Sequence, residues 1–184
     1  MCKIKIFGLG GLNENGKNCY VVEVNDDIFV FVCGLKYATG NLLGIDYIIP
    51  DFSYLEKNKN RIKGVFITHG HQENMGSVAD LVEHIPNIKI YATKFTKYTL
   101  IEDGVPEKNI IEIKVHKKIT FGENSIFPIA ISHSVPDAVM YVLYTKDGSI
   151  CYTGDFTIDP SMMGSYEMDL GKIAYVGKQG VLCL

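Results

Sequence analysis

An uninterrupted apolar segment that ends in two histidines constrains the fold of this chain more than any other feature. Residues 64–68 read Gly-Val-Phe-Ile-Thr, and His69-Gly70-His71 follows directly. A strand that is apolar on both faces belongs in the middle of a sheet that is covered on both sides. The histidines then lie in the loop at the strand's end, where layered α/β folds carry functional side chains. Two imidazoles at i and i+2 can hold one metal ion, because neutral histidine nitrogen is a preferred zinc ligand.

The remaining apolar patterns predict an α/β fold with sheets layered between helices. Further strands are expected at residues 3–7, 19–24, 28–32, 45–49, 89–92, 110–113, 118–121, 125–132, 139–144 and 149–153. Helices are expected at about 52–58, 75–84, 94–102 and 170–176. Asp51 and Thr93 precede two of these helices and are expected to cap them. The apolar residues 180–184 predict a buried strand that is only beginning, as in a piece of a longer protein.

Length and composition limit the class of protein. The 184 residues suffice for one domain with a sizeable core. No segment approaches the roughly 18 consecutive apolar residues of a membrane helix, and the N-terminal segment lacks the apolar core of a signal peptide. The five cysteines are odd in number and scattered, with no Cys-x-x-Cys pair. The cysteine pattern favours reduced thiols and a cytoplasmic protein, and the lack of a long apolar segment predicts that the protein does not contact a membrane.

The charge pattern predicts no general attraction to nucleic acid. The net charge is −3, and Arg61 is the only arginine. Recognition of phosphate by bidentate arginine pairs is therefore nearly unavailable to this chain. Local basic clusters lie at residues 57–63 and 114–118, and we expect them to be solvated loops and strand ends.

Two more polar residues follow apolar strands, as His69 and His71 do. His133 comes after the strand expected at 125–132, and Asp155 after the strand expected at 149–153. Alone, such a histidine is more often hydrogen-bonded than a ligand, and such an aspartate is more often a turn residue. Together with His69 and His71 they form a plausible set of three imidazoles and one carboxylate around a metal.

A glycine-rich segment offers a competing interpretation. Residues 8–13 read Gly-Leu-Gly-Gly-Leu-Asn after the first expected strand. The third glycine of a dinucleotide-binding fingerprint is replaced by Asn13, and the segment that follows resembles a strand and not a helix. We therefore expect these glycines to serve turns.

The ordered set of motifs resembles the ribonuclease J family of RNA-processing nucleases, within the β-CASP group of the metallo-β-lactamase superfamily. The segments that carry the resemblance are residues 10–18, 43–52, 68–71, 133–137 and 153–156. They include Leu-Gly-Ile-Asp and His-Ser-Val-Pro-Asp, which a generic hydrolase of this superfamily would not show. Their order and spacing match over essentially the whole chain. The resemblance implies a metallo-β-lactamase αβ/βα sandwich, of which residues 1–184 would be the N-terminal part, truncated before the β-CASP insertion.

The resemblance also implies roles for the candidate site residues. His69, His71 and His133 would bind the first metal ion, either zinc or manganese. Asp155 would bridge this ion to a second one and would be a catalytic residue. RNA would bind mainly through the β-CASP region, and the full-length protein would be oligomeric.

Three positions depart from the family's motifs. The aspartate and histidine of the second metal site are replaced by Glu73 and Asn74, and the aspartate of a supporting Asp-x-Gly motif is replaced by Val32. Glutamate places its carboxylate one methylene further out, and a neutral amide oxygen is a poor zinc ligand beside imidazole. Val32 lacks the carboxylate that would fix the loop of the histidines. These changes resemble the less active paralogue that accompanies the main ribonuclease J in some bacteria.

Three hypotheses about function follow. The leading one is a ribonuclease J-type protein of RNA processing and decay that binds at most one metal ion, has weak or no nuclease activity and acts beside an active ribonuclease J paralogue. The second is a hydrolase of another ester with a single metal ion, in which Glu73 acts as general base. The third is a non-catalytic interaction module whose histidines bind nothing.

Overall fold

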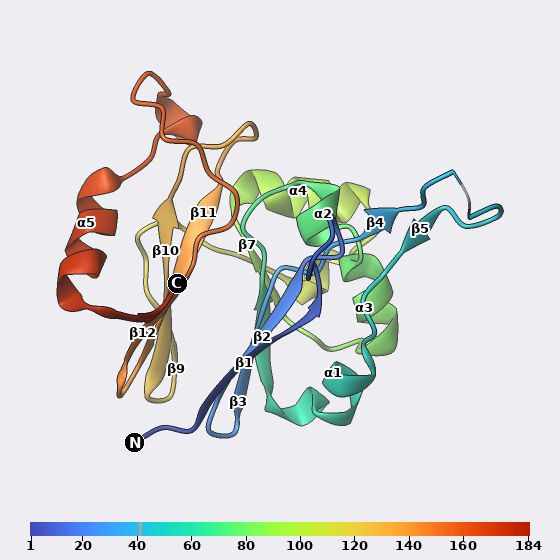
Figure 1. The fold of residues 1–184 in the computed structure, drawn as a ribbon, viewed down its shortest axis with the longest axis horizontal. Helices are drawn as coiled ribbons and strands as arrows, with labels where there is room; N and C mark the ends of the chain where they lie inside the picture. Colours follow the sequence, from blue (N-terminus) through green and yellow to red (C-terminus); the bar gives the residue numbers. More distant parts are fainter. Residues whose placement is uncertain (41) are drawn as a thin grey trace.

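Two β-sheets pack face to face, and helices cover the outer side of each (Figure 1). The computed structural model describes residues 1–40 and 42–184. The first sheet has the order β1 (Ile4–Gly10), β2 (Cys19–Val24), β3 (Asp27–Phe31), β6 (Ile62–Phe66), β7 (Ile90–Ala92) and β8 (Ile110–Glu112). The second has the order β13 (Val181–Cys183), β12 (Gly148–Tyr152), β11 (Val139–Thr145), β10 (Asn124–Ala130) and β9 (Ile119–Phe121).

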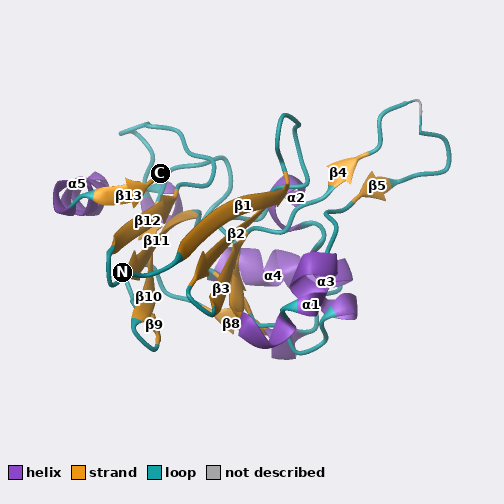
Figure 2. Ribbon diagram, turned by 60° about the horizontal axis from the view of Figure 1, so that its bottom comes forward, coloured by secondary structure: helices purple, strands orange, loops and turns teal. Residues whose placement is uncertain are grey.

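The helices lie on opposite outer sides of this pair of sheets (Figure 2). On the side of the first sheet lie α1 (Ser53–Lys57), α2 (Gln72–Met75), α3 (Val78–His84) and α4 (Lys94–Glu102). On the side of the second sheet lies α5 (Leu170–Gln179). A two-stranded sheet of β4 (Lys36–Tyr37) and β5 (Tyr47–Ile48) extends away from the body. The α/β class and the αβ/βα sandwich expected from the sequence are therefore confirmed.

Strand β6 is the interior strand that the apolar segment predicted. It pairs in parallel with β3 on one side and β7 on the other, and Val65 and Phe66 are fully buried. Its two faces contribute to two different cores: Val65 packs between the first sheet and its helices, and Phe66 packs between the two sheets. Burial on both faces explains why the segment is continuously apolar.

The second sheet is tied to the end of β6 just before the histidines. The hydroxyl of Tyr141, a buried residue of β11, donates a hydrogen bond to the carbonyl oxygen of Ile67 at 2.8 Å. The Val139 amide donates to the Thr68 carbonyl oxygen at 2.9 Å. Phe66 and Tyr91 stack with ring centroids 4.8 Å apart in the core below. The loop that follows β6 is thereby held against the adjacent end of the second sheet.

The single helix expected at residues 75–84 is wrong, because the chain breaks between α2 and α3. At Gly76 a Cβ atom would lie 2.5 Å from Leu35 Cγ and 2.7 Å from the Gln72 carbonyl oxygen. Ser77 donates from its hydroxyl to the Gly34 carbonyl oxygen at 3.0 Å. The break therefore lets the chain dock closely against the segment that follows β3.

Three local expectations are also corrected. Thr93 does occupy the N-cap position of α4, but its hydroxyl donates to the Asp137 carbonyl oxygen instead of capping the helix. The strand expected at 45–49 is reduced to Tyr47–Ile48. The last strand, β13, pairs only with β12 and is exposed, so residues 180–184 do not form a buried strand. Among the residues that the structure describes, no helix has the length and apolar character needed to cross a membrane.

Candidate metal centre

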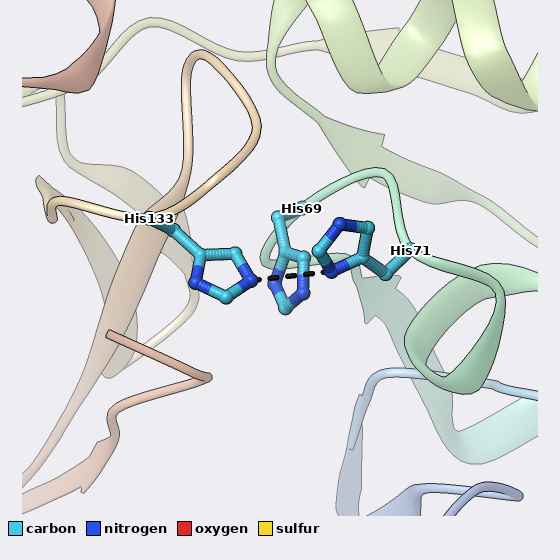
Figure 3. A group of neighbouring side chains, drawn as sticks. All are labelled: His69, His71 and His133. Carbon is cyan, nitrogen blue, oxygen red and sulfur yellow. Dashed lines mark hydrogen bonds between the residues drawn. The ribbon is translucent and has the colours of Figure 1, made fainter. Parts of the chain in front are cut away.

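Three histidines from two loops meet where β6 and β10 end (Figure 3). His69 and His71 follow β6, and His133 follows β10 in the facing sheet. Each of the three can offer one ring nitrogen such that these atoms all lie within 4.8 Å of one another. The structure thus brings together the three histidines that the sequence analysis selected, although 62 residues separate His71 from His133.

The spacing of the facing nitrogens fits a tetrahedral metal site. His133 Nε2 lies 3.2 Å from His71 Nδ1. Two nitrogen ligands of a tetrahedral zinc ion, each at about 2.0–2.1 Å, are about 3.3 Å apart. The imidazole rings stand steeply to one another, with centroids 4.5–4.9 Å apart, so their nitrogens and not their faces converge. The donor set present therefore fits a single ion of the zinc type.

His69 is held as a neutral imidazole. Its side chain is fully buried, and its Nδ1 lies 3.0 Å from the Thr68 hydroxyl oxygen. Burial, together with the neighbouring imidazoles of His133 and His71, lowers the pKa of His69 to about 4, although the carboxylate of Asp155 opposes the shift. Burial also lowers the pKa of His133, and His71 adds to that effect. Neutral imidazole is the form in which histidine binds metal ions.

Asp155 lies beside His69, at one edge of the histidine cluster. It follows β12, and its Oδ2 is 3.6 Å from His69 Nε2. The same oxygen accepts a hydrogen bond from Asn74 Nδ2 at 3.1 Å. The side chain is about half exposed (51%), so the carboxylate faces both the cluster and solvent.

Glu73 and Asn74 both lie on the short helix α2, but they face different surroundings. The Glu73 carboxylate is 3.6 Å from His71 Nδ1, and its side chain is 41% exposed. The Asn74 side chain is buried, with its Nδ2 3.2 Å from His69 Nε2. Of these two residues only Glu73 offers an anionic oxygen beside the histidines.

The segment from Val32 to Gly34 supports α2 through its backbone. The Cys33 amide donates to the Asn74 carbonyl oxygen at 2.8 Å, and the Val32 amide donates to the Phe66 carbonyl oxygen at 3.1 Å. At Gly34 a Cβ atom would lie 1.6 Å from the Glu73 carbonyl oxygen, so no larger residue fits this backbone arrangement. Val32 itself is fully buried and has a φ of +56°.

Three residues of this site were given no role in the sequence analysis. Asn18 Nδ2 donates to Asn74 Oδ1 at 3.2 Å, Thr68 lies against His69 Nδ1, and the Ser134 hydroxyl is 3.5 Å from His71 Nε2. Thr68 and Ser134 adjoin the histidine motifs, so their positions next to ligands could have indicated them. Asn18 is the last residue of the segment 10–18 that carries the resemblance, but that motif does not reveal a contact with Asn74, which lies 56 residues further along the sequence.

Comparison with known protein families agrees with this fold and this site. Residues 12–174 match the metallo-beta-lactamase superfamily, which covers most of the chain. The chain is therefore a member of the metallo-beta-lactamase superfamily. Proteins of this superfamily bind metal ions, and the three converging histidines could hold one here.

Within the superfamily, the chain is similar to ribonuclease J proteins. It is 38% identical to "Ribonuclease J 1" of Streptococcus pyogenes, 37% identical to "Ribonuclease J 2" of Staphylococcus epidermidis and 36% identical to "Ribonuclease J 2" of Staphylococcus aureus. These matches cover 98–99% of the chain and 33% of each relative, so the chain spans about a third of their length. The similar identities do not separate the two ribonuclease J types.

Solved structures confirm the fold alone. A protein of unknown function from Enterococcus faecalis superposes with a TM-score of 0.68 at 20% identity, covering 85% of this chain and 44% of that one. The metallo-beta-lactamase fold protein YhfI from Bacillus subtilis superposes with a TM-score of 0.60 at 16% identity, covering 83% of this chain and 62% of that one.

Proposed function

We propose that this chain belongs to a ribonuclease J-type protein of RNA processing and decay, with one working metal site and weak or no nuclease activity of its own. The similarity to ribonuclease J proteins along 98–99% of the chain supports the substrate class. The observation that carries the proposal is the contrast within the site. Three histidine nitrogens converge at the spacing of a metal centre, whereas the neighbouring Asn74 presents an amide N–H toward His69 and Asp155.

The chain's own residues prepare the first site. Burial keeps His69 neutral, and the Thr68 hydroxyl fixes the orientation of its ring. His71 and His133 direct their nitrogens toward each other from facing loops. A zinc or manganese ion bound by these histidines would lower the pKa of a water molecule for attack on a phosphodiester. Asp155, whose Oδ2 lies 3.6 Å from His69 Nε2, would be a further ligand of this ion.

The second site lacks the ligands that a two-metal mechanism needs. Two ions about 4 Å apart would stabilise both the attacking and the leaving oxygen of the displacement. Glu73 is the only anionic group that α2 offers, and it lies beside His71. Asn74 is turned so that its amide nitrogen, which is not a metal ligand, faces Asp155. We therefore expect at most one ion and low catalytic power.

The setting of this chain is part of the same proposal. Residues 1–184 would form the N-terminal part of a metallo-β-lactamase domain, with the β-CASP region and the rest of the core elsewhere in the protein. RNA would bind mainly through the β-CASP region, and an active ribonuclease J paralogue would be the protein partner in an oligomer. The five cysteines are all free, which agrees with a cytoplasmic protein.

The test is RNA cleavage by the complete gene product, purified without any paralogue. Single-stranded RNA labelled at either end should be cut weakly or not at all in the presence of Zn²⁺ or Mn²⁺. The double variant Glu73→Asp, Asn74→His restores the family motif and should raise the rate, whereas adding His71→Ala to it should remove the gain. Robust cleavage by the unaltered protein alone would contradict the proposal.

One observation favours a second candidate, a hydrolase of another ester with a single metal ion. The Glu73 carboxylate lies 3.6 Å from His71 Nδ1 and is 41% exposed, so it can accept a proton from a water molecule beside the histidines. Turnover of small phosphate or carboxylate esters that is lost in Glu73→Gln, without turnover of RNA, would favour this candidate. Absence of any metal binding would instead favour a non-catalytic interaction module.

A further inference from the structure

The side chain of Asn74 joins two of the groups proposed to bind metal. Its Nδ2 lies 3.2 Å from His69 Nε2 and 3.1 Å from Asp155 Oδ2. Its Oδ1 accepts a hydrogen bond from Asn18 Nδ2 at 3.2 Å. Only 1% of Asn74 is exposed, so water does not compete for these bonds.

The chemistry of the partners fixes which way this amide points. A carboxylate can only accept hydrogen bonds, so the amide atom that faces Asp155 is the nitrogen. Its two N–H groups are then directed one to Asp155 and one to His69 Nε2, which must accept with its lone pair. The ring proton of His69 consequently resides on Nδ1, next to the Thr68 hydroxyl.

A metal ion at the first site would need the electron pairs that this amide already uses. His69 can bind through Nε2 because its Nδ1 faces Thr68, and Asp155 can bind through Oδ2. The Asn74 amide cannot replace a ligand, because its nitrogen carries two hydrogens and no available lone pair. Metal binding must therefore break or displace the hydrogen bonds of Asn74.

We propose that Asn74 is an affinity-determining residue that stabilises the metal-free arrangement of the site and weakens binding of a divalent cation. The proposal rests on the proposed function, which makes His69 and Asp155 metal ligands. Removing the amide should free His69 Nε2 and Asp155 Oδ2 for the ion. Asn18 donates to the Asn74 amide oxygen and so holds the amide nitrogen toward His69 and Asp155, which should further weaken metal binding.

The test compares the affinity for zinc of the unaltered protein and Asn74→Ala, by competition with a chromophoric chelator at neutral pH. Loss of the amide's hydrogen bonds should tighten binding by about tenfold. Asn109→Ala is the matched control, because Asn109 is equally buried but donates to the carbonyl oxygens of Pro86 and Ile88. Its affinity for zinc should be unchanged.

A second measurement separates the proposed effect of Asn74 on zinc affinity from a general effect on folding. With a chelator present, Asn74→Ala should melt at a lower temperature than the unaltered protein, and saturating zinc should raise its melting temperature by more. If Asn74→Ala fails to fold, Asn18→Ala loosens the same amide and should tighten zinc binding by a smaller factor. Circular dichroism verifies the fold of each variant.

The outcomes distinguish the two proposals. If the unaltered protein binds zinc and Asn74→Ala binds it no more tightly, the proposed role of Asn74 is wrong and the proposed metal site stands. If neither of these two proteins binds zinc, both the proposed metal site and the proposed role of Asn74 are wrong. Tighter zinc binding by Asn74→Ala, with no change in Asn109→Ala, supports the proposed role of Asn74.

Discussion

Val32 adopts a backbone conformation that valine rarely occupies. Its φ of +56° lies in the left-handed region, where the branched Cβ is crowded, and such strain costs about 1–3 kcal/mol. The resemblance implies an aspartate at this position, and aspartate tolerates the left-handed region far better than valine. The amide of Val32 donates to the Phe66 carbonyl oxygen at 3.1 Å, and this hydrogen bond holds the turn whatever the side chain at position 32.

The strain at Val32 can be measured against a neighbour. Val30 is equally buried but lies within β3 and has no positive φ. Both Val32→Gly and Val30→Gly remove a buried side chain, yet only Val32→Gly also relieves strain. Denaturant unfolding should show that Val32→Gly costs about 1–2 kcal/mol less than Val30→Gly. Equal losses in the two variants would show that the turn stores no strain.

Gly34 is required by the close approach of the chain to α2. Because a Cβ atom there would lie 1.6 Å from the Glu73 carbonyl oxygen, Gly34→Ala should lower the free energy of unfolding by about 3 kcal/mol and weaken zinc binding. Gly177→Ala is the control, since Gly177 lies in α5 with no atom near the added Cβ. It should stabilise the protein by up to about 1 kcal/mol. A neutral Gly34→Ala would disprove this close approach.

At the scale of elements, Glu23 links β2 to three neighbouring segments. Its buried carboxylate lies 3.0 Å from the Lys5 ammonium of β1 and 3.4 Å from Arg61, and accepts a hydrogen bond from Tyr54 of α1. The hydrogen bond from Tyr54 is the main cause that holds the pKa of Glu23 below its usual value. The positive charges of Lys5 and Arg61 lower the pKa further, whereas burial raises it. The ionised form therefore stabilises the packing of α1 on the first sheet.

This arrangement predicts a pH-dependent contribution to stability. Because the folded-state pKa is lowered, the contribution is fully present above the ordinary value of 4.5 and is lost as the pH falls through the lower folded-state value. Glu23→Gln should cost about 1 kcal/mol at pH 7 and much less near pH 3, measured by urea unfolding. The same change at the exposed Glu123 should have little effect at either pH. A pH-independent cost at Glu23 would contradict the prediction.

Most strands could be predicted from the sequence because their apolar patterns reflect burial directly. The continuous apolar segment before His69 became the interior strand β6, which is buried on both faces. The break between α2 and α3 could not be predicted, since it depends on the approach of Leu35 to Gly76. Exposure of β13 was missed for a similar reason: its apolar sequence does not reveal that the strand pairs on one side only.

At the scale of the whole molecule, the site lies where the ends of strands from both sheets meet. His69 and His71 come from the first sheet, and His133 and Asp155 come from the second. The motif order selected all four of these residues as candidates, because each follows a strand. The role of Asn74 as a donor to His69 and Asp155 could not be predicted, since it depends on the direction in which a buried amide points. The motif pattern alone predicted only that Asn74 stands where the family's motif has a ligand.

The proposed function requires that this site hold at most one metal ion. The most direct test is the number of ions per chain in protein saturated with zinc or manganese, with their positions found by anomalous scattering from a crystal. We predict no more than one ion, bound by His69, His71, His133 and Asp155. Two fully occupied ions about 4 Å apart, with Glu73 among the ligands, would contradict the account.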